Sequence, residues 1–573
     1  MKKKVLALYL VAIIYLAFSI TGLIIFFIPQ EPEEPLPEGV TLVFGTMYGP
    51  VDLDPQVAWD SASIDAIDQV CEGLFAYNLS DPELAIIPNL ALSGTWNPGV
   101  TEFTCVLRQN VTFHDGAPFN ADAVLFTWDR MAWALNSTGT NTDRVTQVAE
   151  LYEFPNGTPI VKDVTKNGNY NVTFELNGPY IPFEALLCFS ASYILSPDST
   201  PAMEYIDTAT GNIVGTGPFV YDNYESGVNV SFHTFDDYWK GRAQIDKLIF
   251  SIITDPNFRN AALLAGDIDF LTDPLDSVLD VFNLTEGITL EQGPHSTVIQ
   301  YLGMNNRLIN VTVREAISYA IDYGYIIDVL KEGNAVRMES PVPKGILYAN
   351  CTFDVPILNL SRARTAMQSM GFGVGWDVTP DGPDELLWEE ATFMTLNYTY
   401  NIGGSIREDI MVLLQKNLGK IGIVVQDAGM TWYNFINRLY EVGNLTRNML
   451  HFYWIGWGSD YNDPSNFINP LFTNRSVASN GVQYNGYAAA IEAGRDPLAL
   501  WDNVQLLMEA GLTELDPVVR EAIYDRIQEL LVEHDRPWAW GYVSKRHCAW
   551  VSNLHGYQQN PMGKEYFYPC YFS

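Results

Sequence analysis

The sequence lacks the motifs of common catalytic and metal-binding classes. It contains no HExxH, GxxxxGK[ST] or GxSxG, and no two of its six cysteines form a CxxC pair. Its seven histidines show no spacing typical of a metal site. We therefore expect a protein that is not an enzyme and holds no cofactor. The 68 acidic residues still leave room for the carboxylate pair of a surface glycosidase.

Positive charge is scarce. The chain carries 32 Lys and Arg against 68 Asp and Glu, a formal net charge of −36. A surface of this sign repels a phosphate backbone, which excludes nucleic acid as a partner. Outside a cell the cysteines could form up to three disulfides, although each could equally stay a buried thiol. They are Cys71, Cys105, Cys188, Cys351, Cys548 and Cys570.

Long apolar runs are absent after the first 28 residues. Three lysines precede an uncharged run at 5–28, which is long enough to span a bilayer. We interpret 1–28 as a membrane anchor, with a long cleaved signal peptide as the alternative, and 29–39 (PQEPEEPLPEG) as a stiff linker. The remainder would lie outside the cell, where its thirteen N-x-S/T sequons predict a glycoprotein.

Strand and helix patterns alternate along the rest of the chain, which predicts an α/β protein of more than one lobe. Residues 162–176 alternate apolar and polar side chains around Asn-Gly signals and predict a hairpin. Asn120 is expected to cap one helix, and Asp516 with Pro517 to begin another. Thr312, followed by Glu315, predicts a capping box.

The stretch 454–470 (WIGWGSDYNDPSNFINP) is the strongest candidate for a binding site. It follows an apolar strand-like run, and its glycines allow a sharp turn. Asp460 is thereby placed beside Trp457 and Tyr461 on a constrained loop. A carboxylate bordered by aromatic faces suits an ammonium group. The alternative is that Asp460 caps a turn while the aromatic rings pack in a core.

Several segments, in order along the chain, resemble the family 5 extracellular solute-binding proteins, the peptide- and nickel-type receptors of ABC importers. The most recognisable are LRQNVTFHDG at 107–116, NADAV at 120–124 and WDR at 128–130. The others are LDP (53–55), EGL (72–74), PNLA (88–91), GTGPF (215–219), DYWKG (237–241), GDID (266–269), VREAI (313–317), AID (320–322) and SPVP (340–343).

The resemblance implies a two-lobed periplasmic-binding-protein-like α/β fold with an extra subdomain on the first lobe. We expect lobe I at 40–300 and 505–573, the inserted subdomain at 95–210, and lobe II at 301–504. It also implies a monomeric receptor that closes around a solute and delivers it to a membrane permease with its partner ATPase.

In oligopeptide receptors of this family, an aspartate in a segment like GSDYNDP at 458–464 pairs with the α-ammonium group of the peptide, and Asp460 matches that position. We expect the ligand-binding residues to be Asp460, Trp457, Tyr461, Trp454, Tyr48 and Gly458. An oligosaccharide is the alternative ligand because the chain is rich in aromatic residues. Nickel is a less favoured ligand because the sequence has no histidine cluster. Outside the family, the alternatives are a surface hydrolase, a sensor or a chaperone.

Overall fold

The computed structural model describes residues 39–82, 84–136, 139–141, 148–403, 405–440, 450–474 and 482–573. The anchor predicted at 1–28 lies outside these ranges. Among the described residues, no helix has the length and apolar character needed to cross a membrane. All six cysteines are free thiols, five of them buried and Cys351 partly so, and none of the disulfides considered from the sequence forms.

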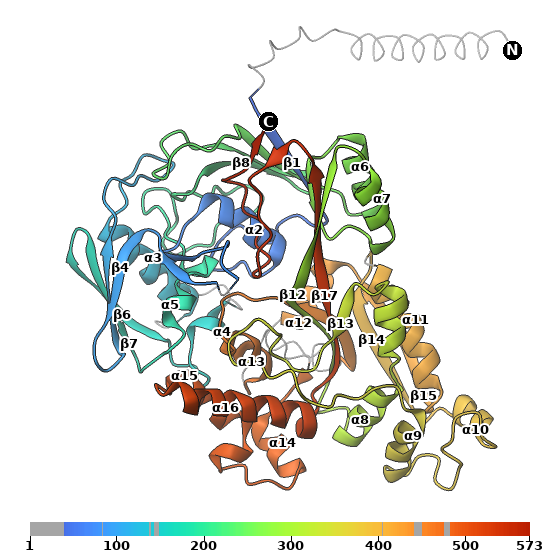
Figure 1. Cartoon of the computed structure of the whole chain (residues 1–573). Helices are drawn as coiled ribbons and strands as arrows, with labels where there is room; N and C mark the ends of the chain where they lie inside the picture. The colour runs from blue at the N-terminus through green and yellow to red at the C-terminus, as the bar shows by residue number, and fades with distance from the viewer. Residues whose placement is uncertain are drawn as a thin grey trace, which may run out of the picture. The chain divides into compact units, whose positions relative to one another are not determined.

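A main sheet of eleven strands contains both parallel and antiparallel pairs (Figure 1). Its order is β15-β14-β16-β12-β17-β11-β1-β10-β9-β8, and β13 also pairs with β17. The strands are β1 (Thr41–Thr46), β8 (Phe219–Glu225), β9 (Asn229–Thr234), β10 (Lys247–Ile252), β11 (Phe270–Thr272), β12 (Ile288–Met304), β13 (Ala335–Arg337), β14 (Met394–Asn401), β15 (Ile423–Met430), β16 (Phe452–Trp457) and β17 (Trp538–Val551).

Strands β12 and β17 connect the two ends of this sheet. They pair antiparallel along most of their length, from Ile288 opposite Val551 to Gly303 opposite Trp538. On one side β17 continues to β11 and β1, and on the other β12 continues to β16. Three register shifts interrupt the ladder, which bends and twists a sheet locally. The long pair therefore occupies the place expected for strands that join two lobes.

A separate antiparallel sheet has the order β4-β5-β7-β6, with bounds Ala91–Trp96, Glu102–Leu107, Asn171–Leu176 and Val161–Gly168. Strands β6 and β7 form the predicted hairpin. Helix α3 (Ala121–Ala134) lies against this sheet and starts at the predicted cap, since Asn120 Oδ1 accepts hydrogen bonds from the backbone of Asp122 and Ala123. The expected extra subdomain is thus a small sheet covered by a helix. Two-stranded pairs β2 (Phe75–Tyr77) with β3 (Ile86–Pro88), and β18 (Leu554–His555) with β19 (Tyr571–Phe572), complete the strands.

The remaining helices flank the sheets. Asp516 caps α16 as predicted, with Pro517 in its first turn. The capping box at Thr312 is wrong, because Asn310, two residues earlier, accepts from the Thr312 backbone N–H and begins α8. The helices are α2 (Ser61–Val70), α4 (Ala149–Tyr152), α5 (Phe183–Leu186), α6 (Pro256–Ala265), α7 (Leu279–Leu284), α8 (Val311–Ala320), α9 (Leu360–Ser369), α10 (Glu385–Glu390), α11 (Ser405–Gly419), α12 (Trp432–Tyr440), α13 (Ser465–Phe472), α14 (Gly486–Glu492), α15 (Val504–Thr513) and α16 (Pro517–Glu529).

Separate hydrophobic clusters fill the space around the sheets. One surrounds the small sheet and α3, and another packs on β1, β9 and β10. Two more lie on the opposite faces of β16, and helices α15 and α16 contribute to one of these. The lobe boundaries expected at 300 and 505 stay a prediction.

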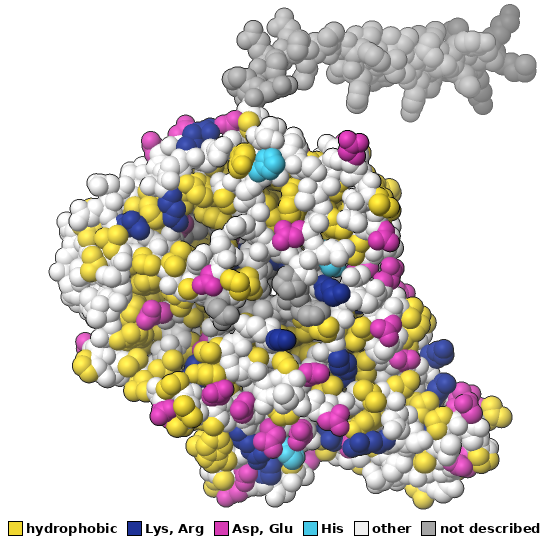
Figure 2. Space-filling view, in the orientation of Figure 1, with side chains coloured by type: hydrophobic (Ala, Val, Ile, Leu, Met, Phe, Trp, Pro, Cys, Tyr) yellow, Lys and Arg dark blue, Asp and Glu magenta, His cyan; other side chains and the backbone are white. Residues whose placement is uncertain are grey.

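Acidic side chains are spread over the whole face shown in Figure 2, among a smaller number of Lys and Arg side chains. This distribution agrees with the net charge of −36.

Candidate functional site

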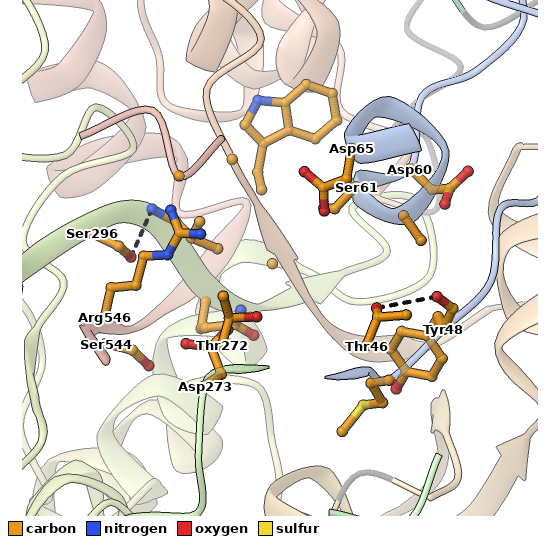
Figure 3. Close-up of a pocket in the computed structure, with 18 of the residues that line it drawn as sticks. Thr46, Tyr48, Asp60, Ser61, Asp65, Thr272, Asp273, Ser296, Ser544 and Arg546 are labelled. Atoms are coloured by element: carbon orange, nitrogen blue, oxygen red, sulfur yellow. Dashed lines mark hydrogen bonds between the residues drawn. The ribbon is translucent and has the colours of Figure 1, made fainter. Parts of the chain in front are cut away.

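A cavity of about 920 Å³ lies beside the middle strands of the main sheet, and Figure 3 shows side chains that line it. Its wall comes from the loop after β1, the start of α2, the turn at 272–277, strand β17, helix α12, the end of β16 and the loop at 561–565. Figure 3 shows polar and charged side chains around it, including Tyr48, Asp65, Asp273 and Arg546. A volume of this size is at the upper end of the range for small-molecule sites.

Strand β16 brings the predicted loop to this cavity. It pairs with β12 from Phe452 to Trp457, but β14 meets it only at Phe452 and Tyr453. A Cβ added at Gly456 would lie 2.2 Å from the end of the Gln300 side chain, which would have to move to make room for it. Successive side chains on a strand point to opposite faces. Trp457 and Ile455 therefore belong to one hydrophobic cluster and Trp454 to the other.

Four of the six predicted ligand-binding residues line the cavity: Tyr48, Trp457, Gly458 and Asp460. Trp454 does not, because the alternation of β16 turns its ring into the core, where it stacks on Tyr542. Tyr461 is likewise a core residue, 1% exposed in the cluster around the small sheet. Trp454 and Tyr461 therefore pack in the core, as the alternative interpretation of this stretch predicted.

Asp460 is a buried carboxylate without a cationic partner. Its oxygens accept hydrogen bonds from Asn466 Nδ2 at 2.7 Å and from Trp59 Nε1 at 3.2 Å. No described Lys or Arg forms an ion pair with it, and Lys564 acts on it only electrostatically. Burial raises its pKa to about 7, although both hydrogen bonds and Lys564 oppose the shift. An ammonium group entering the cavity would supply the missing positive charge.

The hydrogen bond from Trp59 to Asp460 joins residues that are 401 positions apart in the sequence. The Trp59 ring also meets Trp457 edge-on, with centroids 5.4 Å apart. Trp59 stands just before α2, in a stretch with no motif that sets it apart from a core tryptophan. Sequence reasoning missed it because only the fold brings the two segments together.

Arginines without carboxylate partners surround Tyr48. Arg259 lines the cavity, is 3% exposed, and donates from Nη1 to the Ile253 carbonyl. Arg407 donates to Asn401 Oδ1 and lies 5.9 Å from the Trp432 ring centroid. Neither forms an ion pair within the described part of the chain.

The Tyr48 ring links this group to the cavity. It stacks on Trp432 at 5.8 Å, and its hydroxyl accepts a hydrogen bond from Asn401 Nδ2 at 3.3 Å. Burial lowers the pKa of Arg259 and Arg407, whose charges in turn oppose the rise that burial causes in the pKa of Tyr48. A positive region thus adjoins the cavity around Tyr48, in which Arg259 is attracted by Asp273 and Asp255 without a direct ion pair, and no sequence motif marks it.

The arrangement suits recognition. Fixed charges of both signs and aromatic rings can hold and orient a polar solute. Within the described ranges, one group of three His, Cys, Asp or Glu residues lies within metal-binding reach of each other. It consists of Glu529, Glu533 and His534, none of which lines the cavity.

Comparison with known proteins places the chain in a family. Residues 85–479 match the model described as bacterial extracellular solute-binding proteins, family 5. The chain is 25% identical to heme-binding protein A of Haemophilus influenzae, over 92% of this chain and 91% of that protein. It is 24% identical to the dipeptide-binding protein of Escherichia coli, over 92% and 94%.

A solved structure supports the same fold. The periplasmic binding protein DppA of Helicobacter pylori, solved with the peptide STSA, superposes with a TM-score of 0.77 at 23% identity, over 93% of this chain and 98% of that one. The predicted α/β fold of this class, with an additional small antiparallel sheet, is confirmed. The family consists of binding proteins rather than enzymes, as predicted. The chain belongs to the family 5 bacterial extracellular solute-binding proteins, the solute receptors of ABC importers.

Proposed function

We propose that this receptor captures peptides with free termini between two lobes that close around them, and delivers them to its membrane permease. The observation that carries the proposal is the charge pattern in and beside the cavity. Among the described residues, no cation pairs with the buried Asp460 carboxylate, and no carboxylate pairs with Arg259 on the cavity wall or with Arg407 beside it. A peptide zwitterion carries both missing charges.

Charge separation within one cavity is costly unless something compensates it. Burial of an ion without a partner costs roughly several kcal/mol of hydration free energy. An opposite charge in a good geometry offsets this cost. The ammonium end of a peptide would pair with Asp460, and its carboxylate would lie toward Tyr48 and the two arginines. Charge-assisted hydrogen bonds of this kind fix orientation as well as adding affinity.

The backbone of the solute has a pairing edge available. Beyond Tyr453, the edge of β16 that faces away from β12 has no strand partner among the described residues, and Ile455 to Gly458 line the cavity there. An extended peptide added along this edge would form main-chain hydrogen bonds that do not depend on its side chains. This supports broad specificity, with Trp457 and Tyr48 contacting the side chains.

Closure of the lobes would bring the two sides of the cavity together. In this structure Tyr48 stacks on Trp432, and Trp59 donates to Asp460. Both contacts join the first 60 residues of the described chain to residues after 430. They would break when the lobes open and form again around a bound solute.

Thermal unfolding with a panel of solutes tests the proposal. Peptides of two to ten residues at about 100 times their dissociation constant should stabilise the protein by about 2.7 kcal/mol. N-acetylated and C-amidated versions should bind more weakly, because each removes one charge. If none of the free peptides shifts the unfolding transition, peptides are not the solute.

An oligosaccharide is the second candidate. Trp59, Trp432 and Trp457 present indole rings at the cavity wall, and sugar rings stack on such faces. A neutral sugar would leave Asp460 and the arginines unpaired, so the charge pattern favours peptides. Stabilisation by β-linked oligosaccharides where peptides have no effect would reverse this preference.

A further inference from the structure

A second carboxylate on the cavity wall, that of Asp65, forms no ion pair with a described residue. It lies in a cluster of acidic and basic side chains. Asp65 on α2, Asp68 and Glu565 are the acids, and Lys564 and Arg546 are the bases. Lys564 Nζ is 2.9 Å from Asp68 Oδ2, and Arg546 pairs with Glu565. Both bases are thus committed elsewhere, and Asp65 forms no ion pair with any described residue.

The environment of Asp65 disfavours its charge in the protein alone. Burial is the main cause of a pKa well above the usual range, and the nearby Glu565 and Asp68 carboxylates raise it further. The attraction of Arg546 and a hydrogen bond from the Glu565 backbone N–H oppose the shift without cancelling it. A positive group brought next to Asp65 would therefore be bound favourably.

Asp65 is also reachable from the cavity. It is only partly buried, it lines the cavity, and Figure 3 shows its carboxyl group on the side of α2 that borders the space. Asp60, at the start of the same helix, differs because its oxygens accept from the Ser63 backbone and hydroxyl and so cap the helix. The Asp65 carboxylate does not cap the helix and accepts instead from the Glu565 backbone N–H.

The ammonium and Asp65 sites share one wall. Lys564 pairs with Asp68, one turn after Asp65, and also acts electrostatically on Asp460. Trp457 lines the same cavity, is 7% exposed, and its Nε1 has no acceptor within the described ranges. Buried polar groups in proteins are normally satisfied, so an acceptor on a bound solute would complete this one.

We propose that Asp65 is a specificity-determining residue that pairs with a lysine or arginine side chain of the bound peptide, so that the receptor prefers basic peptides. The inference rests on the proposed peptide-binding function and narrows its substrate class. The terminal ammonium group of the peptide pairs with Asp460. The cationic side chain pairs with Asp65, because Lys564 and Arg546 are already paired with other carboxylates.

Matched peptides test this preference in the full-length protein. Tripeptides of alanine with one lysine at the first, second or third position are compared with the same peptides carrying norleucine, which keeps the aliphatic chain and lacks the ammonium group. Isothermal titration should show at least one lysine peptide binding roughly tenfold tighter than its norleucine match, as expected for a desolvated charge pair. Equal affinities at all three positions would overturn the inference.

The variant Asp65→Asn separates this residue from the general acidity of the cavity. It should reduce the lysine preference to about twofold or less and leave norleucine peptides bound as before. Asp409→Asn is the matched control, because Asp409 also lines the cavity but is exposed on α11, and it should keep the preference. A preference that survives in Asp65→Asn would overturn the assignment.

The outcomes also distinguish this inference from the proposed function. If no peptide of either kind binds, peptide capture itself fails. If peptides bind without regard to lysine, only the role of Asp65 fails. The comparison of lysine with norleucine needs no variant, so it decides the question even if Asp65→Asn does not fold.

Discussion

The pH dependence of peptide binding should be governed by Asp460. Its pKa is raised to about 7 by burial, so near neutrality half of the empty receptor carries a protonated carboxyl group at this position. Only the ionised form attracts the peptide ammonium. Binding must therefore remove the proton, and acidification must weaken the affinity.

The size of the effect follows from the ionised fraction, which is about one half at pH 7 and about 1% at pH 5 for a pKa of about 7. The affinity should fall about 50-fold between these two pH values. Above pH 8 the peptide ammonium itself loses its proton, since α-amino groups titrate at about 7.7–8.0. The affinity should peak between about pH 7 and 8 and decrease on both sides.

Asp460 should also affect the stability of the empty protein, and in the opposite direction: stability should fall as the pH rises, whereas affinity should increase. A carboxyl whose pKa is raised on folding contributes stability below its unfolded pKa of about 3.8, and this is lost as the pH rises through about 7. Three pKa units correspond to about 4 kcal/mol. In Asp460→Asn the loss of stability with rising pH disappears, because the amide does not titrate. The variant also loses one of the two hydrogen bonds from Trp59 and Asn466, because an amide NH2 group replaces one of the carboxylate oxygens. That loss costs about 1 kcal/mol.

Isothermal titration of one dipeptide at pH 5, 6, 7 and 8 measures the binding effect, and urea unfolding at the same pH values measures the stability. Wild type should lose affinity on acidification, whereas Asp460→Asn should bind weakly and with little change between pH 5 and 7. If the variant keeps both the wild-type affinity and its slope with pH, the carboxyl group that takes up the proton is not Asp460.

Three further predictions concern other charges and the thiols. Arg407→Gln should weaken a free dipeptide roughly tenfold but leave its C-terminal amide unchanged, because no described carboxylate pairs with Arg407; equal losses for the two ligands would contradict its pairing with the peptide carboxylate. Arg130→Met should lower the free energy of unfolding by about 3–5 kcal/mol in urea titrations, because it leaves the fully buried Asp54 without its cation, and a loss below 1 kcal/mol would refute this. A reductant should not change the melting temperature, because all six cysteines are free; a decrease would reveal a disulfide.

Local features of the fold were predictable from short patterns. The Asn120 cap, the Asp516 cap with Pro517, and the β6–β7 hairpin each depend on residues within a few positions of one another. The error at α8 is of the same local kind, since Asn310 and Thr312 are both good caps two residues apart and the structure uses the first. Competition between neighbouring caps is decided by the packing of the helix, which the pattern does not contain.

The candidate site was predictable only where one stretch of chain carries it. The strand, the glycines and the acid–aromatic turn singled out the loop after β16, and the resemblance of its GSDYNDP segment to the family singled out Asp460, which lines the cavity. The same reasoning placed Trp454 beside the ligand, because it ignored that neighbouring strand residues face opposite sides. Trp59, Arg259 and Arg407 come from distant segments and resemble ordinary core or surface residues in sequence.

The buried and partly buried ions of the fold differ in whether they have a partner of opposite charge. Arg130 and Asp54 are fully buried and satisfy each other, as a structural pair must, since an isolated buried ion is strongly destabilising. Asp460 is also buried, and Asp65 and Arg407 are partly buried, yet in a chain with 68 acidic and 32 basic residues none of the three forms an ion pair with another described residue. Under the proposed function, the charges that compensate these positions in and beside the cavity are supplied by the solute.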